Sequence, residues 1–226
     1  MFLELRGIKK SFFNGEKVIE VLKGIDLKVE RGEKIAIVGP SGSGKTTLLN
    51  IVGTIDKPTS GELLFNGKKI DYENDEGLSL LRRKKIGFVF QFYHLLPELN
   101  VFENIIIPGL IEGLSFRNIE KIGYELLDRL KLLHKKEARV YTLSGGERQK
   151  LAIGRALFLK PELLLVDEPT GNLDPESAKE VLNLFLELNK EFHITLIMVT
   201  HNMEIAKKMD RVYLLKEGFL VEYRKP

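Results

Sequence analysis

Short apolar runs separated by stretches of helical periodicity are the main pattern along this chain. Runs rich in Leu, Ile and Val read as buried strands; they are KIAIVG at 34–39, KIGFVFQ at 85–91, LLLVDEP at 163–169 and TLIMVTH at 195–201. Buried strands that alternate with helices are typical of a parallel sheet covered on both faces. A ligand site of such a sheet is expected at the carboxyl ends of its strands.

A second kind of pattern, alternation of apolar and polar positions, occupies the two ends of the chain. FLELRGIKKSF at 2–12 and EVLKGIDLKVERGE at 20–33 predict an antiparallel pair, and KPTSGELLFNG at 57–67 adds a turn and a strand. RVYLLKEGFLVEY at 211–223 predicts a hairpin that turns at Gly218. The chain therefore combines its α/β core with an antiparallel β subdomain.

The middle of the chain has helical periodicity from about 100 to 133. We expect Pro108 to break the first helical piece, and Ser115 to cap the next one. A further amphipathic helix is predicted over 175–192, with Pro175 at its first position. We interpret residues 1–226 as one domain, in which a helical lobe of about 92–144 is inserted into a core of about 1–91 and 145–226.

Composition and charge exclude several classes of protein. Hydrophobic residues make up 43% and charged residues 30% of the 226 positions, as in ordinary globular chains. The net charge of +3 is too small to indicate a nucleic-acid partner, and none is expected. The absence of cysteine excludes disulfides and thiol chemistry, and no signal-peptide pattern or long apolar run is visible, so a cytosolic chain is expected.

The segment GPSGSGKT at 39–46 fits the pattern G-x-x-x-x-G-K-[ST] between a predicted strand and a predicted helix. Its glycines let the backbone N–H groups surround phosphate oxygens. The lysine reaches the β- and γ-phosphates, and the last hydroxyl binds Mg²⁺. The segment therefore supplies candidate phosphate-binding residues, which are Gly39, Pro40, Ser41, Gly42, Ser43, Gly44, Lys45, Thr46 and Thr47.

Polar residues also end the other predicted strands. Asp167 is placed to hold Mg²⁺ together with Thr46, and Glu168 is placed to accept a proton from an attacking water. Gln91 and His201 end their strands in the same way, although each on its own is as readily a structural residue. Because all of these strand ends are expected on one rim of the sheet, a shared site is favoured.

A second glycine-rich helix start lies far downstream, in LSGGERQK at 143–150. Free N–H groups and the helix dipole make such a start suitable for an anion. Its candidate anion-binding residues are Ser144, Gly145 and Gly146.

Taken together, GPSGSGKT, Gln91, LSGGE, LLLVDEPTGNLD and His201 resemble the ATP-binding cassette (ABC) ATPases along essentially the whole chain. The resemblance implies a P-loop NTPase (RecA-like) core, ATP and Mg²⁺ as ligands, and a homodimer that closes head to tail around two ATP molecules. Ser144–Gly146 would then bind the γ-phosphate of ATP held by the partner subunit.

The resemblance also implies roles for individual residues. Gln91 would sense the metal and the attacking water, Glu168 would be the general base, and His201 would contact the γ-phosphate. Asp174 of GNLD would lie at the dimer interface, and Phe12 would stack on adenine, with Phe13 as its rival. Two positions depart from the commoner family pattern, which has glutamine at Glu147 and tyrosine at Phe12.

The segment QFYHLLPELNVFEN at 91–104, with LSGGERQ and DEPTGNLD, resembles most the ATPases of lipoprotein-releasing systems. A macrolide-exporter type of ATPase and a soluble non-transport ABC ATPase are the alternatives. The resemblance implies a peripheral protein on the cytoplasmic face of the inner membrane. It would drive separate membrane subunits that dock near Gln91–Leu96, on Phe92, Tyr93, Leu95 and Leu96.

Overall fold

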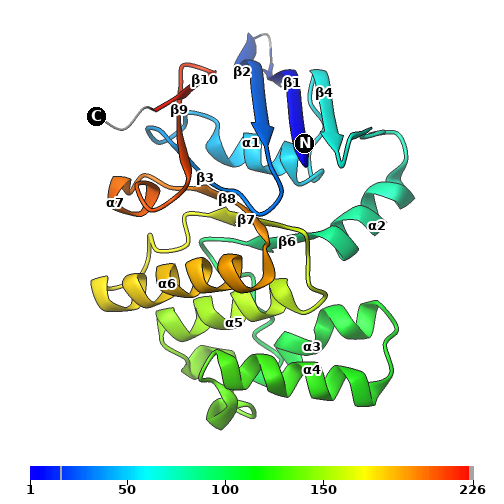
Figure 1. The fold of residues 1–226 in the computed structure, drawn as a ribbon, viewed down its shortest axis with the longest axis vertical. Coiled ribbons are helices and arrows are strands. Elements are labelled where there is room, and N and C mark those ends of the chain that lie inside the picture. The colour runs from blue at the N-terminus through cyan, green and yellow to red at the C-terminus, as the bar shows by residue number, and fades with distance from the viewer. Residues whose placement is uncertain (16, 224–226) are drawn as a thin grey trace.

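The computed structural model describes residues 1–15 and 17–223, and it is built around a six-stranded sheet (Figure 1). In spatial order its strands are β10 (Phe219–Glu222), β9 (Arg211–Lys216), β3 (Lys34–Val38), β8 (Thr195–Val199), β7 (Leu163–Asp167) and β6 (Ile86–Val89). The five strands from β9 to β6 are parallel, and only β10 is antiparallel. Their carboxyl ends therefore share one rim, as the sequence pattern predicts.

A second, antiparallel sheet lies above the first in the view of Figure 1. Its order is β2 (Lys17–Val29), β1 (Leu3–Asn14), β4 (Ser60–Phe65) and β5 (Lys68–Lys69). This sheet is the antiparallel β subdomain expected from the alternating pattern at the start of the chain. Its apolar face packs onto the central sheet together with α1 (Lys45–Val52).

The other helices lie at the edge of the central sheet or below it in Figure 1. They are α2 (Asp75–Lys85), α3 (Val101–Ile111), α4 (Phe116–Arg129), α5 (Gly145–Leu157), α6 (Pro175–Phe192) and α7 (Met203–Ala206), with 3₁₀ turns at Leu133–Lys135 and Val140–Thr142. α5 and α6 cover the lower face of the sheet, and α3 and α4 form a further layer beneath them. Within residues 1–15 and 17–223, no helix has the length and apolar character that a membrane span requires.

Both faces of the sheet are buried along the inner strands β3, β8 and β7, which explains their continuous apolar runs. Along β3, Ile35 and Ile37 belong to the upper core, whereas Ala36 and Val38 belong to the lower core. This alternation follows from the two-residue period of a strand. The rigid two-faced sheet is what fixes the positions of the polar residues at its rim.

A third apolar core lies among α3, α4 and α5, with Ile105, Ile119 and Leu127 near its centre. α5 contributes to two cores at once, because Leu151 packs into the third core and Ile153 into the lower face of the sheet. The lobe boundaries at about 92 and 144 stay a prediction, since α5 joins the lobe and the sheet without a break.

Pro108 does not break its helix, so this expectation was wrong. α3 runs from Val101 to Ile111, with Pro108 in its last turn. A proline there removes one backbone donor, and the neighbouring Ile105, Ile106 and Gly109 remain buried and hold the turn in place. The helix ends at Ile111, and Gly113, two residues further on, has a left-handed φ of 74°.

Candidate functional site

A cavity of about 520 Å³ opens at the rim where β3, β6, β7 and β8 end. Its described lining comprises Val21, Ser41, Gly42, Gly44, Lys45, Thr46, Thr47, Gln91, Asp167, Glu168 and His201. The fold thus brings together the phosphate loop and the four polar residues that the sequence places at the ends of three strands, β6, β7 and β8. The parallel direction of the strands accounts for this convergence.

The phosphate loop needs glycine at particular points. Gly44 begins α1 with a φ of 97°, in the left-handed region that side chains avoid. A Cβ on Gly39 would lie 2.3 Å from the carbonyl oxygen of Leu215, so only glycine fits there. Ser41, Gly42 and Thr47 line the cavity, whereas Gly39, Pro40 and Ser43 are not among its described lining residues.

The side chain of Lys45 is buried beneath this loop. Its Nζ donates hydrogen bonds to the carbonyl oxygens of Gly39 and Pro40, both at 2.9 Å. These two bonds help to satisfy a buried cation that has no salt bridge among the described residues, although its charge also acts on the nearby Asp167 carboxyl. The ammonium group is therefore held inside the loop, where a phosphate would meet it.

Thr46 and Asp167 lie side by side at the cavity wall. The Thr46 hydroxyl donates a hydrogen bond of 2.9 Å to Asp167 Oδ2. Burial raises the pKa of the Asp167 carboxyl, the bond from Thr46 opposes this, and nearby Glu168 adds to it. Burial penalises the charged form of the Asp167 carboxylate. A cation bound between the Thr46 hydroxyl oxygen and Asp167 Oδ2 would offset that penalty.

The donor set fits Mg²⁺, which favours oxygen ligands and keeps several positions for water and substrate phosphates. Thr46, Asp167 and Gln91 all line the same cavity. In the described part of the chain, no group of three or more His, Asp or Glu residues could hold a metal ion by itself. A metal at this site would therefore rely on phosphate oxygens for part of its coordination.

Glu168 has a left-handed backbone, with a φ of 44°, directly after β7. Such a conformation costs a non-glycine residue about 1–3 kcal/mol and is concentrated at functional sites. Its N–H donates a hydrogen bond of 3.0 Å to Val199 O, which ties the residue after β7 to the end of the neighbouring strand β8. The strain explains how two successive residues, Asp167 and Glu168, both line one cavity although neighbours on a strand face opposite ways.

His201 contacts Glu168 directly. Its Nδ1 lies 2.9 Å from Glu168 Oε2, and its backbone N–H donates to the same oxygen at 3.3 Å. Two strand ends that are 33 residues apart in sequence are thus joined at the cavity. Gln91 also lines the cavity, and its Nε2 lies 3.0 Å from where a Cβ on Gly171 would be.

The second glycine-rich helix start lies outside this cavity. Ser144 is the N-cap of α5, and its hydroxyl accepts a hydrogen bond from Glu147 N at 3.2 Å. Glu147 reaches back to Ser144 N at 2.9 Å and also pairs with Lys135 at 2.6 Å. Neither Ser144 nor the two glycines after it are among the described lining residues of the cavity.

Two other predicted ligand-binding residues also lie outside the cavity. Asp174 caps α6 by accepting hydrogen bonds from Glu176 N and Ser177 N. Phe12 is 42% exposed on β1 with Lys10 Nζ 5.0 Å from its ring centre, and Phe13 is 81% exposed. Of the described residues that line the cavity, neither phenylalanine is one, so stacking of either on adenine stays a prediction.

A second cavity of about 640 Å³ lies between α2, β6, α3 and α5, and is lined by residues such as Arg83, Phe88, Leu96, Ile111 and Arg155. Of the four residues predicted to dock a partner, Leu96 lines this cavity, and the other three are not among its described lining residues. Phe92 is 71% exposed and Leu96 43% exposed. Leu95 packs against the third core, and Tyr93 faces α5.

Sequence reasoning missed two residues of the first site. Val21 lines the cavity from β2, and its Cγ1 lies 2.7 Å from where a Cβ on Gly44 would be. Gly171 lies against Gln91. No local signal marks Val21, because only the packing of the antiparallel sheet brings it to the rim. Gly171 belongs to the GNLD segment, but no sequence pattern predicts its contact with Gln91.

Comparison with known proteins agrees with this geometry. The model of the family described as "ABC transporter" matches residues 22–171. The chain belongs to the ABC transporter family. It is therefore an ATP-hydrolysing subunit of an ABC transporter, with the P-loop cassette fold and antiparallel β subdomain that the sequence predicts.

Relatives of this ABC transporter ATPase match it over nearly their whole length. It is 46% identical over 219 residues to a protein of Syntrophus aciditrophicus named "Lipoprotein-releasing system ATP-binding protein LolD", covering 97% of this chain and 98% of the relative. A protein of the same name from Aquifex aeolicus is 48% identical over 211 residues, covering 92% and 94%.

Solved structures match the whole fold as well. The dimeric structure of the bacterial ABC transporter cassette MJ0796 superposes with a TM-score of 0.90 at 36% identity, and both chains are covered completely. A dimeric post-hydrolysis state of the same cassette, bound to ADP and Pi, gives a TM-score of 0.88 at 35% identity, again with complete coverage. ATP binding and hydrolysis, and a family whose cassettes form dimers, are thereby supported.

Proposed function

We propose that this ABC transporter ATPase works as a head-to-tail homodimer at the cytoplasmic face of the inner membrane, and that it drives lipoprotein release. The observation that supports a dimer is that the starts of α1 and α5, the two glycine-rich helix starts, lie apart within one chain. α1 opens into the cavity that holds Lys45, whereas α5 begins outside it. A partner subunit would supply the missing helix start to each ATP.

Within one chain, the phosphate loop would bind the ATP phosphates. Lys45 would exchange the carbonyl oxygens of Gly39 and Pro40 for phosphate oxygens. Charge-assisted hydrogen bonds of this kind are stronger than bonds to neutral carbonyls. Thr46 and Asp167 would hold Mg²⁺, which would supply positive charge against the charge that develops on the phosphates.

Glu168 would act as the general base. In hydrolysis a water oxygen bonds to the γ-phosphorus, the bond between that phosphorus and ADP breaks, and the water loses a proton. Glu168 lies at the cavity wall, and His201 orients its Oε2. Gln91 lines the same cavity and would hold the water. His201 is 69% exposed, so its ring is accessible to the γ-phosphate as well.

The membrane subunits would dock in the cavity between α2, β6, α3 and α5. Its wall is largely apolar and continues onto exposed Ile111, and Phe92 lies close by in sequence to its lining residue Leu96. Exposed apolar patches of this kind mark protein interaction sites. Lipoprotein as the cargo is proposed because relatives that are 44–48% identical over nearly their full length are named for lipoprotein release.

The first experiment measures steady-state ATPase activity and ATP-dependent dimerisation of the Glu168→Gln variant. We expect turnover to fall by roughly 100-fold or more, because general base catalysis contributes about 10²–10⁴-fold. Dimers formed with ATP and Mg²⁺ should persist. The matched control is Glu125→Gln on α4, a carboxylate that is 65% exposed and should leave turnover within twofold. Normal turnover in Glu168→Gln, or full activity of a strictly monomeric protein, would overturn the mechanism.

A second experiment tests docking and cargo. Tagged protein is recovered in mild detergent from membranes of the source cells, and the proteins that co-purify are identified. A membrane subunit together with bound lipoprotein supports the proposal. A periplasmic adaptor with the membrane subunit indicates an exporter, and ribosomal proteins alone would overturn the transport role.

Docking is separated from folding by a pair of matched variants. Ile111 and Val221 are 63% and 62% exposed, but only Ile111 lines the proposed docking cavity. Ile111→Asp should lose the membrane subunit and keep ATPase activity. Val221→Asp, on the edge strand β10, should keep both.

A further inference from the structure

A further cavity of about 450 Å³, here the α4–α6 cavity, lies where α4 meets the ends of α5 and α6. Among the described lining residues, it shares none with the cavity that holds Lys45, and only Pro161 with the cavity proposed for the membrane subunits. Ligand pockets of proteins enclose about 300–1,000 Å³ and are mostly apolar, with a few polar groups. The α4–α6 cavity therefore has the size of a small-molecule site, and neither ATP nor the proposed docking uses it.

The apolar lining of the α4–α6 cavity comes from three parts of the chain. Ile122 and Leu126 belong to α4, Leu157 and Phe158 to the end of α5, and Ile194 to the segment before β8. Leu157, Phe158 and Ile194 are buried, so the packing of the core holds them in place. An apolar group that enters the cavity is removed from water against this fixed lining, which favours its binding.

A salt bridge joins α4 to α6 at the cavity. Arg129 donates two hydrogen bonds to the carboxylate of Glu191, one of them 2.7 Å long. These bonds lower the pKa of the Glu191 carboxyl, so both partners are charged at neutral pH. The Arg129 guanidinium also lies 5.0 Å from the ring centre of Phe192, within the range of a cation–π contact. The two charges of this pair are thus compensated within the cavity lining.

The other two charged lining residues differ in their surroundings. Glu125 of α4 has Lys121 Nζ at 4.0 Å, one turn earlier on the same helix. Lys160, which follows α5, is exposed and has no acidic partner among the described residues. An ammonium group beside an apolar cavity, without a counter-charge from the described chain, attracts an anion.

The size of the cavity also distinguishes a small molecule from a protein segment. One turn of α-helix, about 10 Å across and about 5.4 Å long, takes up roughly 400 Å³. A docked helix would therefore fill the cavity with a single turn, and it would need a longer apolar groove for its remaining turns. The exposed side chains of Glu125, Lys160 and Glu191 border the cavity instead.

We propose that the α4–α6 cavity binds an anionic amphiphile of the class of single-chain fatty acids. The carboxylate lies at Lys160, and the apolar tail lies against Leu126, Leu157 and the other apolar lining residues. This binding needs neither ATP nor a second subunit. The inference therefore goes beyond the proposed function and does not rest on it.

The chain contains no tryptophan, so a single introduced tryptophan can report on the cavity. Phe192→Trp places an indole in its lining. Titration with laurate, below its micelle concentration, should shift the emission of this variant to shorter wavelength and reach saturation. The shift should be the same with and without ATP.

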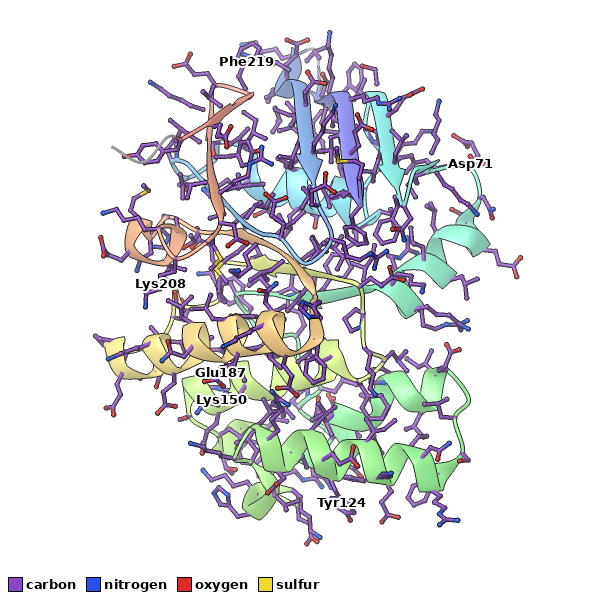
Figure 2. The ribbon with its side chains drawn as sticks, in the orientation of Figure 1. Asp71, Tyr124, Lys150, Glu187, Lys208 and Phe219 are labelled. Atoms are coloured by element: carbon purple, nitrogen blue, oxygen red, sulfur yellow. The ribbon has the colours of Figure 1, made fainter. Side chains whose placement is uncertain are left out.

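Phe219→Trp is the matched control for this reporter. Phe192 is 45% exposed with Arg129 5.0 Å from its ring centre, and Phe219 is 51% exposed with Lys23 Nζ 5.7 Å from its ring centre. Phe219 lies on β10, at the opposite end of the molecule from α4 (Figure 2). Laurate should leave the emission of Phe219→Trp unchanged.

The charge is tested on the ligand and on the protein. Dodecanol has the same tail without the carboxylate, so it should bind at least about fivefold more weakly than laurate. Lys160→Glu, made in Phe192→Trp, should weaken laurate binding at least about fivefold, because reversing a charge exceeds the loss of one exposed ion pair. It should leave dodecanol binding within about twofold. Lys208→Glu, at another exposed lysine that is outside the described lining (labelled in Figure 2), should change neither affinity.

A second measurement uses the chain without tryptophan. A ligand that binds only the folded state raises the midpoint of thermal unfolding. Laurate should therefore raise this midpoint, acetate at the same concentration should not, and Lys160→Glu should reduce the rise. This measurement keeps the test if Phe192→Trp does not fold.

Four results would overturn the inference. They are no binding of laurate, an equal response at both tryptophans, equal affinity for laurate and dodecanol, and unchanged laurate binding in Lys160→Glu. None of them concerns ATP hydrolysis or dimer formation, so the proposed function would stand. A failure of the proposed function in the Glu168→Gln experiment would likewise leave the laurate result unaffected.

Discussion

The starts of α1 and α5 are both glycine-rich, yet they differ in how their backbone N–H groups are capped. α1 begins at Gly44 with no capping side chain and no acidic residue in its first turn among the described residues. α5 begins at Ser144 with a complete capping box and with Glu147 in its first turn. One helix start is left open for a ligand, and the other is partly satisfied by its own chain, through the N–H groups of Ser144 and Glu147.

The difference is electrostatic as well as geometric. An open start offers free N–H groups and the positive end of the helix dipole to an anion. At α1 the buried ammonium of Lys45 adds a full positive charge. At α5 the carboxylate of Glu147 opposes an anion, and its pairing with Lys135 largely cancels that charge. The α5 start is therefore a poor anion site alone, which suits a surface that completes a site held by another chain.

The largest effect is expected at α1, from Lys45→Ala. Removing the charge from the phosphate loop should weaken ATP binding to single chains by roughly 100-fold or more, since truncating a buried charged contact costs 2–5 kcal/mol. Isothermal titration calorimetry measures this change in ATP affinity. Lys150→Ala on α5 (Lys150 is labelled in Figure 2) is the matched control, because Lys150 forms a salt bridge with Glu180 of α6. Equal losses in both variants would remove the distinction between the two helix starts.

The next effect is expected at α5, from Gly146→Ala. An added Cβ would lie 2.9 Å from Ser177 Oγ and 3.0 Å from Ser177 Cβ, so α5 must shift away from α6. Overpacking of this kind costs about 1–3 kcal/mol. ATP binding to single chains should stay within twofold, whereas ATPase activity should fall at least about tenfold. The double variant Gly146→Ala/Ser177→Gly makes room for the methyl group and should recover much of the activity; no recovery would argue against the steric cause.

The sequence predicted what depends on local pattern. The helix over 175–192 has its predicted limits, because Asp174 and Pro175 mark its start and an amphipathic stripe runs to Phe192. The convergence of Asp167, Glu168, Gln91 and His201 also followed from the sequence, since each residue ends a buried strand and parallel strands share a rim.

What the sequence did not predict depends on packing between distant elements. Val21 reaches the cavity only because the antiparallel sheet lies over α1. The sequence did not predict that Tyr93 has a left-handed backbone and lies against Arg148 of α5, and its part in docking stays a prediction. Pro108 was expected to end a helix, and burial of its neighbours outweighed the missing donor. The roles of the site residues stay predictions until the variants are measured.

A change far from both helix starts should alter stability alone. Glu162 precedes β7, at the opposite end of that strand from Asp167. Burial would raise its pKa, but hydrogen bonds from Lys85, Arg31 and Asn66 lower it to about 2. A lowered pKa stabilises the fold at every pH above the ordinary value of 4.5, and this contribution is lost as the pH falls toward 2.

Glu162→Gln should therefore reduce the free energy of unfolding at pH 7 by about 1–2 kcal/mol, a figure discounted because the cationic partners are about half exposed. Urea unfolding of both proteins at pH 7 and at pH 3 measures it, and the difference between them should shrink at pH 3. ATP binding and dimerisation should not change. A constant difference across pH would mean that the glutamine alters packing rather than charge.

The smallest effect is expected from Lys135→Ala, and it tests the electrostatic half of the comparison. Burial would raise the pKa of Glu147, but hydrogen bonds from Lys135 and Ser144 lower it, so the carboxylate is charged at neutral pH. Without Lys135 that charge would face the partner's γ-phosphate uncompensated. The pair is partly exposed, at 33% and 23%, so the loss should be below about 1 kcal/mol, or roughly threefold in dimerisation.

Two comparisons make this small effect decisive. Glu147→Gln keeps an acceptor for the capping box and removes the charge, so the double variant Lys135→Ala/Glu147→Gln should dimerise at least as well as the parent. The loss of dimerisation in Lys135→Ala should also become smaller as the salt concentration rises from about 0.05 M to about 0.5 M, because salt screens exposed charges. A loss that persists in the double variant and in salt would mean that Lys135 supports the start of α5 by packing, and that the two helix starts differ in geometry rather than in charge.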